Sequence, residues 1–348
     1  MSDETLGRDE TGVLGRNPVS GPQNPPHSSP STDLRDRARG CAVGAAVGDA
    51  LGMPLEFGPP QPAGRLVREM QGGRLRPGTF TDDTEMALAL AESLLTRLPL
   101  DPADLAQRFA AWYRAGPSDV GNHTRVVLAR ISAGEPWEQA VDAVQRQRPD
   151  SAGNGSVMRC WPVALAHWDD PALVGARLPR PSVPSLLVAD SLLQSRVTHP
   201  HPECQAGSSL VNLTIYRLMR GAPPAEAVAW ALDASGVPKP LRTVVEQAPA
   251  CRREALENTG WVHHTLESAF WSLLTTDSFE EAVVQVVNLG RDADTAGAVI
   301  GALAGAAYGL EAIPARWRTV LRGEWPLGSG RVWQCDDLIA LADKMISR

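Results

Sequence analysis

Two short segments gather carboxylate and hydroxyl side chains in a way that could bind cations. The first is TDDTE at residues 81–85, and the second is DADT at residues 292–295. Each stands before a stretch with helical spacing, where a Thr or Asp side chain often caps the helix and an acid favours its positive end. Capping explains one acid and one hydroxyl per helix, but not two aspartates in each segment. If the four aspartates converge, their repulsion requires a neutralising cation.

The ligand types in these segments indicate which cation this would be. Carboxylate and hydroxyl oxygens suit Mg²⁺, Mn²⁺ or Ca²⁺. Zinc is disfavoured, because no set of His and Cys residues has the spacing of a zinc site. Two Asp and one Thr in each segment could hold two ions, bridged by a shared carboxylate. A metal site and two ordinary helix caps both remain open on these residues alone.

A glycine-rich loop, SAGNGS at residues 151–156, precedes another helical stretch. A Gly/Asn turn at a helix N-terminus presents backbone N–H groups that suit phosphate oxygens. The loop lacks the GK[ST] of a Walker motif and follows no strand, so a simple turn is the alternative. The segment THPHP at residues 198–202 joins two expected helices, and its imidazoles could stack on a ring, bond a ribose or cap a helix. We interpret His263 and His264 as structural.

The elements that must position these segments are helices. Ala and Leu recur at spacings of three and four, whereas alternating β-branched runs are almost absent, so an all-α protein is expected. Pro and Gly separate the expected helices. These helices cover residues 37–52, 82–97, 102–115, 123–133, 136–147, 156–167, 184–197, 203–220, 224–235, 240–257, 263–275, 278–288, 294–309 and 334–346.

Two of the expected helices carry glycine at every fourth position. These residues are Gly40, Gly44, Gly48 and Gly52 in the first, and Gly297, Gly301, Gly305 and Gly309 in the second. Residues four apart share a helix face, so each helix has a ridge without side chains. Each helical glycine costs about 1 kcal/mol relative to alanine, which indicates close backbone packing. If the two ridges pack together, the segments around residues 49 and 294 approach each other.

Composition limits the class of protein. The chain has 348 residues and a net charge of −7, which argues against broad nucleic-acid affinity. No 18-residue apolar run and no secretory signal are found, and the five cysteines are scattered and odd in number, so we expect a cytoplasmic protein with reduced thiols. Residues 1–33 are rich in Gly, Pro, Ser and Asn, and we expect a disordered tail there and a single helical domain over 34–348.

Five segments together resemble the ADP-ribosylglycohydrolase family. They are GAAVGDALGMPLEF (44–57), FTDDTEMAL (80–88), SAGNGSVMR (151–159), VTHPHPE (197–203) and NLGRDADTAGAVIGALAGAAYG (288–309), and their order agrees with the family over roughly residues 37–323. The resemblance implies an orthogonal multi-helix bundle with two Mg²⁺ or Mn²⁺ ions in a cleft. The metal ligands that it implies are Thr81, Asp82, Asp83, Asp292, Asp294 and Thr295.

The resemblance also implies roles around the metals. Glu56 matches the family's acidic residue near the scissile ribose, and either Glu56 or Asp83 would accept a proton from the attacking water. The loop Gly153, Asn154, Gly155 and Ser156 would cradle the diphosphate, and His199 would contact the nucleotide. Residues 119–121, ending in Gly121, resemble a further substrate loop. One departure is Arg291, which stands where many members have glycine.

The implied reaction is metal-dependent removal of ADP-ribose from an acceptor, with arginine-linked ADP-ribosyl protein expected first. Serine-linked, O-acetyl and nucleobase-linked ADP-ribose remain alternatives, and a nucleic-acid substrate is less favoured by the acidic charge. A binding or structural relative without activity is the remaining alternative, because a fold alone does not specify an activity. No membrane partner is expected, and a monomer is favoured although the sequence does not reveal the oligomeric state.

Overall fold

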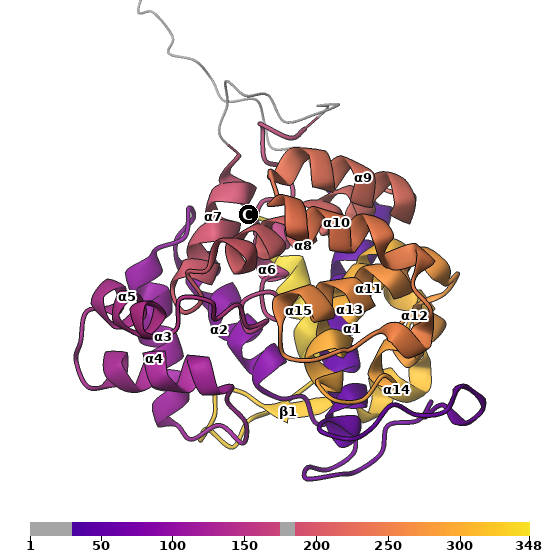
Figure 1. The fold of residues 1–348 in the computed structure, drawn as a ribbon, viewed down its shortest axis with the longest axis horizontal. Helices are drawn as coiled ribbons and strands as arrows, with labels where there is room; N and C mark the ends of the chain where they lie inside the picture. Colours follow the sequence, from indigo (N-terminus) through magenta and orange to yellow (C-terminus); the bar gives the residue numbers. More distant parts are fainter. Residues whose placement is uncertain (1–29, 175–184) are drawn as a thin grey trace, which may run out of the picture.

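Two glycine-rich helices, α1 (Thr32–Gly52) and α13 (Ala293–Tyr308), run through the centre of the fold (Figure 1). We describe a computed structural model over residues 30–174 and 185–348. The two helices pack along their glycine ridges, as expected. A Cβ atom on Gly48 would lie only 1.9 Å from the carbonyl oxygen of Gly297, and the pairs Gly44–Gly301 and Gly40–Gly305 repeat the contact at 2.3 and 2.4 Å. The dispersion contacts of this close approach offset the cost of glycine in a helix.

The remaining helices surround this pair and cross one another at many angles, as an orthogonal bundle does (Figure 1). The described residues form fifteen α-helices in total, so the all-α prediction is confirmed. The others are α2 (Asp82–Thr96), α3 (Pro102–Arg114), α4 (Asn122–Ser132), α5 (Trp137–Gln147), α6 (Pro162–Ala166), α7 (Leu186–Arg196), α8 (Pro202–Met219), α9 (Pro224–Ser235), α10 (Lys239–Gln247), α11 (Val262–Thr275), α12 (Phe279–Val287), α14 (Ala315–Val320) and α15 (Cys335–Ile346).

Several elements differ from the sequence-based expectation, and one of them, the short helix α14 (Ala315–Val320), was not predicted. The helix expected at 156–167 is only the short α6, which begins at Pro162. Before it, the backbone N–H groups of Val157 and Met158 both donate to the carbonyl of Asn154, so residues 153–160 form turns instead of a helix. The helix expected at 240–257 ends at Gln247, just before Pro249, which has no N–H to continue the ladder. Two strands, β1 (Arg322–Glu324) and β2 (Val332–Gln334), form an antiparallel ribbon that is too short to show alternation in sequence.

The N-terminal region is described from residue 30. Ser31 caps α1 by accepting a hydrogen bond from the backbone N–H of Leu34, so the helix begins slightly earlier than the expected domain boundary at 34. The tail predicted for residues 1–33 otherwise lies outside the described residues. No helix in residues 30–174 and 185–348 is long and apolar enough to span a bilayer.

Candidate functional site

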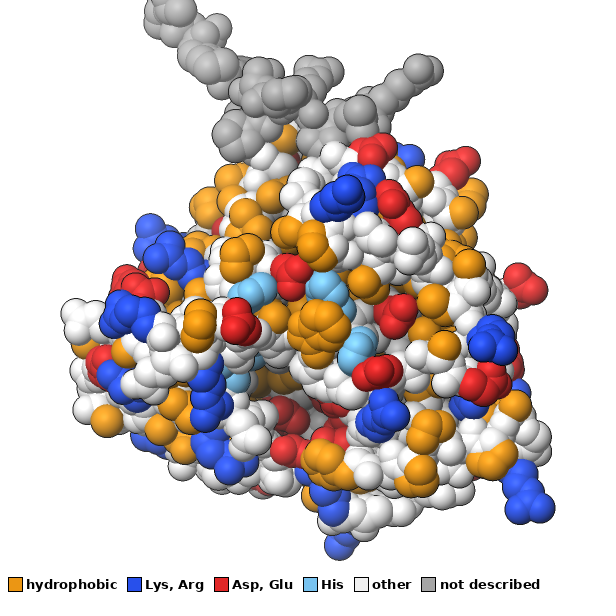
Figure 2. Space-filling model, viewed as in Figure 1, with side chains coloured by type: hydrophobic (Ala, Val, Ile, Leu, Met, Phe, Trp, Pro, Cys, Tyr) orange, Lys and Arg blue, Asp and Glu red, His pale blue; other side chains and the backbone are white. Residues whose placement is uncertain are grey.

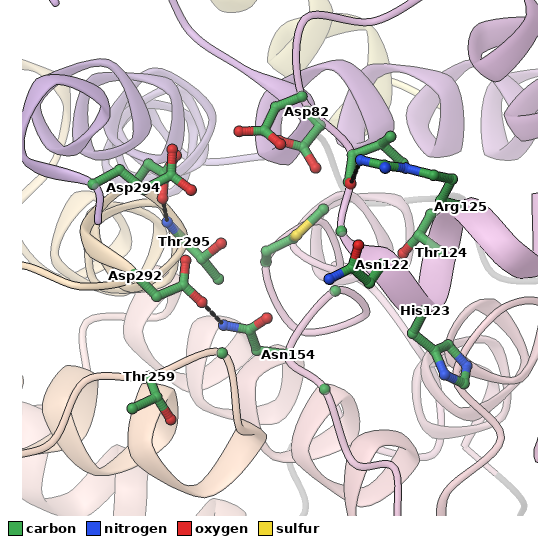
Figure 3. A pocket seen from close by; sticks show the side chains of 18 of the residues that line it. Asp82, Asn122, His123, Thr124, Arg125, Asn154, Thr259, Asp292, Asp294 and Thr295 are labelled. Atoms are coloured by element: carbon green, nitrogen blue, oxygen red, sulfur yellow. Dashed lines mark hydrogen bonds between the residues drawn. The ribbon is translucent and has the colours of Figure 1, made fainter. Parts of the chain in front are cut away.

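A cleft of about 760 Å³ brings the two acidic segments together with the glycine loop. Acidic side chains lie inside a hollow on the face in Figure 2. In the close view, Asp82, Asp292 and Asp294 point toward a common space, with Asn154 on one side of it (Figure 3). Asp82 comes from the start of α2 and Asp294 from the start of α13, so segments more than two hundred residues apart form one site.

The first acidic segment is held by a carboxylate that the sequence analysis did not assign to the site. Asp49, in the last turn of α1, is fully buried. It accepts hydrogen bonds from the backbone N–H and the hydroxyl of Thr81, each at about 2.9 Å, and from the hydroxyl of Thr84 at 2.5 Å and its N–H at 3.2 Å. Thr81 is the N-cap residue of α2, but its side chain makes no capping bond. Asp49 therefore fixes this turn, and the aspartates that follow are not used as caps.

The second acidic segment begins at the N-terminus of α13. Asp292 is the N-cap residue, and its side chain makes no capping bond within the described helix. Its Oδ2 instead accepts a hydrogen bond of 2.6 Å from the side-chain amide of Asn154 in the glycine loop. Asp294 accepts a bond of 2.9 Å from the backbone N–H of Thr295. The structural alternative, that these residues are ordinary helix caps, does not describe either segment.

The converging carboxylates fit a hard cation. One carboxylate oxygen each of Glu56, Asp292 and Asp294 lies within 4.8 Å of the other two. Asp83 Oδ1 is buried and has no hydrogen-bond partner among the described residues. Burial and then the neighbouring carboxylates raise the pKa values of Asp83 and Asp294 well above their usual range. Converging carboxylates that repel one another, one of them with a buried oxygen that lacks a partner among the described residues, could hold Mg²⁺ or Mn²⁺, and the residues present fit that group.

The predicted ligand residues are arranged around this point. Thr81, Asp83, Asp294 and Thr295 are buried, whereas Asp82 and Asp292 are half-buried at the cleft. The hydroxyl of Thr81 lies 3.3 Å from Asp83 Oδ2.

A guanidinium stands beside the acidic cluster. Arg74 Nη2 lies 2.7 Å from Glu56 Oε2 and 2.7 Å from Asp119 Oδ2, and 3.6 Å from Asp294 Oδ2. Burial, followed by repulsion from Asp119, nevertheless raises the pKa of Glu56 to about 7. A carboxyl with a pKa near neutrality is suited to exchange protons with a reacting water. Arg74 was not identified from the sequence, because it lies in a long irregular segment without periodicity.

The glycine loop has a different setting from the one expected. It is not followed at once by a helix; instead, the N–H of Asn154 donates to the carbonyl of Gly260 at 3.0 Å, and the loop pairs with residues 260–262. Gly155 lies against His199, since a Cβ there would be 2.7 Å from the imidazole Cε1. Besides α2 and α13, which carry the acidic segments, the N-terminus of α4 also faces the cleft, and the predicted residue Gly121 is its N-cap.

The predicted substrate residues divide into two groups. Gly121, Gly153, Asn154, Gly155 and His199 all line the cleft. Ser156 is fully buried, and its hydroxyl accepts a bond of 2.9 Å from Ser195 Oγ, so it supports the loop from behind.

The imidazole of His199 is held by a hydrogen bond at its Nδ1. The Thr198 hydroxyl lies 2.8 Å from this atom, and it also accepts from the buried guanidinium of Arg159 at 2.8 Å. Burial, with smaller contributions from His123 and Arg159, lowers the His199 pKa well below its usual range. A neutral ring has one donor and one acceptor nitrogen, and its Nε2 faces the glycine loop, since a Cβ on Gly153 would lie 3.4 Å from it.

Comparison with known proteins places these features in a family. The model of the ADP-ribosylglycohydrolase family matches residues 30–348. The chain is 34% identical over 308 residues to ADP-ribosylarginine hydrolase Tri1 of Serratia proteamaculans, covering 84% of this chain and 77% of that protein. It is also 34% identical over 282 residues to the ADP-ribosyl-[dinitrogen reductase] glycohydrolase of Rhodospirillum rubrum, covering 80% and 85%. A solved structure described as an ADP-ribosylglycohydrolase-related protein complex superposes with a TM-score of 0.73 at 36% identity, covering 91% of this chain and 99% of the other.

Proposed function

Because the chain belongs to the ADP-ribosylglycohydrolase family, we propose that it removes ADP-ribose from arginine side chains of a protein acceptor. Membership makes the chain an ADP-ribosyl glycohydrolase. The arginine linkage is supported by two relatives at 34% identity, one named for ADP-ribosylarginine and the other for an ADP-ribosylated protein, dinitrogen reductase. The free state of all five cysteines supports a cytoplasmic location for this activity.

One observation carries the catalytic part of the proposal. The two acidic segments and Glu56 meet in a single cleft, and a buried oxygen of Asp83 has no partner among the described residues. We assign two Mg²⁺ or Mn²⁺ ions to Thr81, Asp82, Asp83, Asp292, Asp294 and Thr295. Such ions, when bound, orient the ribose hydroxyls and lower the pKa of a water molecule.

The chain's own residues divide the remaining work. ADP-ribose would place its diphosphate along the glycine loop and the N-terminus of α4, where backbone N–H groups and the helix dipole favour negative charge. His199, which lines the cleft beside the loop, would form a hydrogen bond with the nucleotide through Nε2. Holding the distant end of the substrate in this way fixes the anomeric carbon at the acidic end of the cleft. The bond there breaks through a transition state with oxocarbenium character, which nearby carboxylates stabilise.

Glu56 is the better supported of the two candidate proton acceptors. It lines the cleft, whereas Asp83 is buried and is not among the described residues that line it. The pKa of Glu56 near 7 lets its carboxylate take a proton from water and return it to the departing guanidine. Asp83 would then serve as a ligand, with Asp49 holding its turn in place.

The test is release of ADP-ribose from arginine-, serine-, O-acetyl- and nucleobase-linked substrates with Mg²⁺ or Mn²⁺, and with EDTA as the control. We expect release from the arginine linkage that EDTA abolishes. Replacement of Asp82 or Asp294 by alanine should remove this activity, because each substitution deletes a ligand. Release from another linkage alone would contradict the arginine assignment, and full activity of either variant would contradict the metal assignment.

A further inference from the structure

Three non-glycine residues with a left-handed backbone conformation meet at one edge of the cleft. Among the described residues, the non-glycine residues with positive φ are Phe57 (61°), Asn258 (47°) and Arg291 (56°). For Phe and Arg this conformation is costly and persists only where surrounding contacts enforce it, whereas Asn adopts it more readily. Such positions cluster at functional sites more often than elsewhere.

Hydrogen bonds between the segments that carry these three residues hold the backbone in this conformation. The N–H of Phe57 donates to the carbonyl of Arg291 at 2.6 Å, and the N–H of Arg291 donates to the carbonyl of Gly58 at 2.8 Å. Asn258 accepts from the N–H of Asp292 at 3.1 Å and donates through its side chain to the carbonyl of Gly290 at 2.7 Å. The segment after Glu56 and the segment before Asp292 are therefore locked together, and the side chains of Phe57 and Arg291 are fixed at the rim.

These two side chains are directed outward but belong to the cleft. Both line it, and Phe57 is 80% exposed, the most exposed of the large hydrophobic residues described. The guanidinium of Arg291 donates to the backbone carbonyl of Glu257 and makes no ion pair with any described residue, although carboxylates are numerous nearby. Burial of the exposed phenyl group against an apolar partner would be favourable, and so would an ion pair between the Arg291 guanidinium and a carboxylate.

The place of this rim indicates which partner would cover it. Phe57 directly follows Glu56, beside the anomeric carbon in the proposed binding mode, whereas the diphosphate and the nucleotide lie along the glycine loop and His199. A group attached at the anomeric carbon, beside Glu56, would therefore lie next to this side of the cleft. We infer that Phe57 and Arg291 contact the acceptor protein, with Phe57 covering an apolar side chain and Arg291 pairing with an acidic side chain next to the modified arginine. This inference rests on the proposed function and defines its preferred acceptor sequence.

Glycine variants test this inference without distorting the backbone. Phe57→Gly and Arg291→Gly remove the side chains at positions where glycine adopts positive φ freely, so the relief of strain roughly offsets the added flexibility of the unfolded chain. Thermal unfolding of both variants should therefore match that of the wild type. Val332→Ala is the matched control, because Val332 is also an exposed hydrophobic residue but lies in β2, outside the cleft.

Three substrates separate acceptor contacts from ADP-ribose contacts. The first is free ADP-ribosyl-L-arginine, the second is a peptide with Leu and Glu flanking the ADP-ribosylated arginine, and the third is the same peptide with Ala at both flanks. For the wild type and Val332→Ala, kcat/KM should be highest on the Leu/Glu peptide. In each glycine variant, the ratio of kcat/KM on that peptide to kcat/KM on the free compound should fall roughly tenfold, as for loss of one good interface contact.

The outcomes distinguish this inference from the function on which it rests. If the variants lose activity equally on all three substrates, Phe57 and Arg291 bind ADP-ribose and the inference is wrong. If the ratio does not change although the free compound is cleaved, the rim makes no acceptor contact and only the proposed function survives. If the wild type cleaves no arginine-linked substrate, both are overturned.

Discussion

The contact between the two glycine ridges makes a quantitative prediction for Gly48→Ala. The added Cβ would lie 1.9 Å from the carbonyl oxygen of Gly297, whereas ordinary contact begins at 3.4 Å. The neighbour is backbone on a second helix, so no side-chain rotation can relieve the clash, and α1 and α13 must separate by about 1.5 Å there. Overpacking costs about 1–3 kcal/mol, and a backbone clash belongs at the upper end; alanine returns about 1 kcal/mol of helix propensity. The expected net loss is about 2 kcal/mol.

Denaturant titration and thermal unfolding measure this loss. For a chain of this size, about 2 kcal/mol corresponds to a fall in Tm of about 3 °C. Gly64→Ala is the matched control, because a Cβ at Gly64 meets no atom within 4 Å and should change stability little. Equal stability of the two variants would refute the argument that the ridge requires glycine. Separation of the helices should also weaken Mn²⁺ binding in Gly48→Ala, since it displaces Asp294 from the α2 turn.

Three further predictions concern the site. Asp49→Ala removes the carboxylate that accepts hydrogen bonds from Thr81 and Thr84, although Asp49 does not itself line the cleft. Because this carboxylate orients the metal-binding turn, its loss should weaken Mn²⁺ binding in calorimetry by about 10–100-fold. Mn²⁺ at 100 times its Kd should raise the free energy of unfolding of the wild type by about 2.7 kcal/mol, and a similar rise in Asp294→Ala would contradict the assigned ligand. Burial keeps the His199 pKa low, so only the unfolded chain takes up this proton below about pH 6.5, and stability is lost as pH falls. In urea titrations, the free energy of unfolding of His199→Gln should fall less steeply with decreasing pH than that of the wild type, by up to about 1.4 kcal/mol per pH unit between pH 6.5 and 5. An unchanged pH dependence would show that His199 becomes charged in the folded state.

The parts of the fold that the sequence predicted are those with a period. Glycine at every fourth position of two helices predicted the central contact, and the structure pairs the ridges residue by residue, Gly40 with Gly305 and Gly48 with Gly297. The helices with regular Ala and Leu spacing were located to within a few residues. The exceptions have local causes: Pro249 ends α10 early, and the turn around Asn154 delays α6. Neither effect changes the hydrophobic spacing from which the helices were predicted.

The site was predictable only where one segment carries several ligand types. The TDDTE and DADT segments stand out in the sequence, whereas Asp49 and Arg74 are single charged residues in unrelated surroundings. Asp49 reaches Thr81 and Thr84 across 32 and 35 positions, and Arg74 reaches Asp119 across 45. Such partners are determined by how the helices cross, which spacing along the chain does not encode.

Helix α1 connects the fold to the site, because both acidic segments are positioned against it. Its Asp49 fixes the turn that begins α2, and its Gly52 contacts the carbonyl of Ala293 one residue before Asp294, since a Cβ there would lie 2.3 Å away. The distance between the two sets of aspartates is therefore determined by α1 and by how closely its glycines let α13 approach it. A substitution that leaves every ligand in place but enlarges a ridge residue should consequently reduce metal affinity and stability together. A substitution of a ligand such as Asp82, which is half-buried at the cleft, should reduce metal affinity without lowering the stability of the metal-free protein.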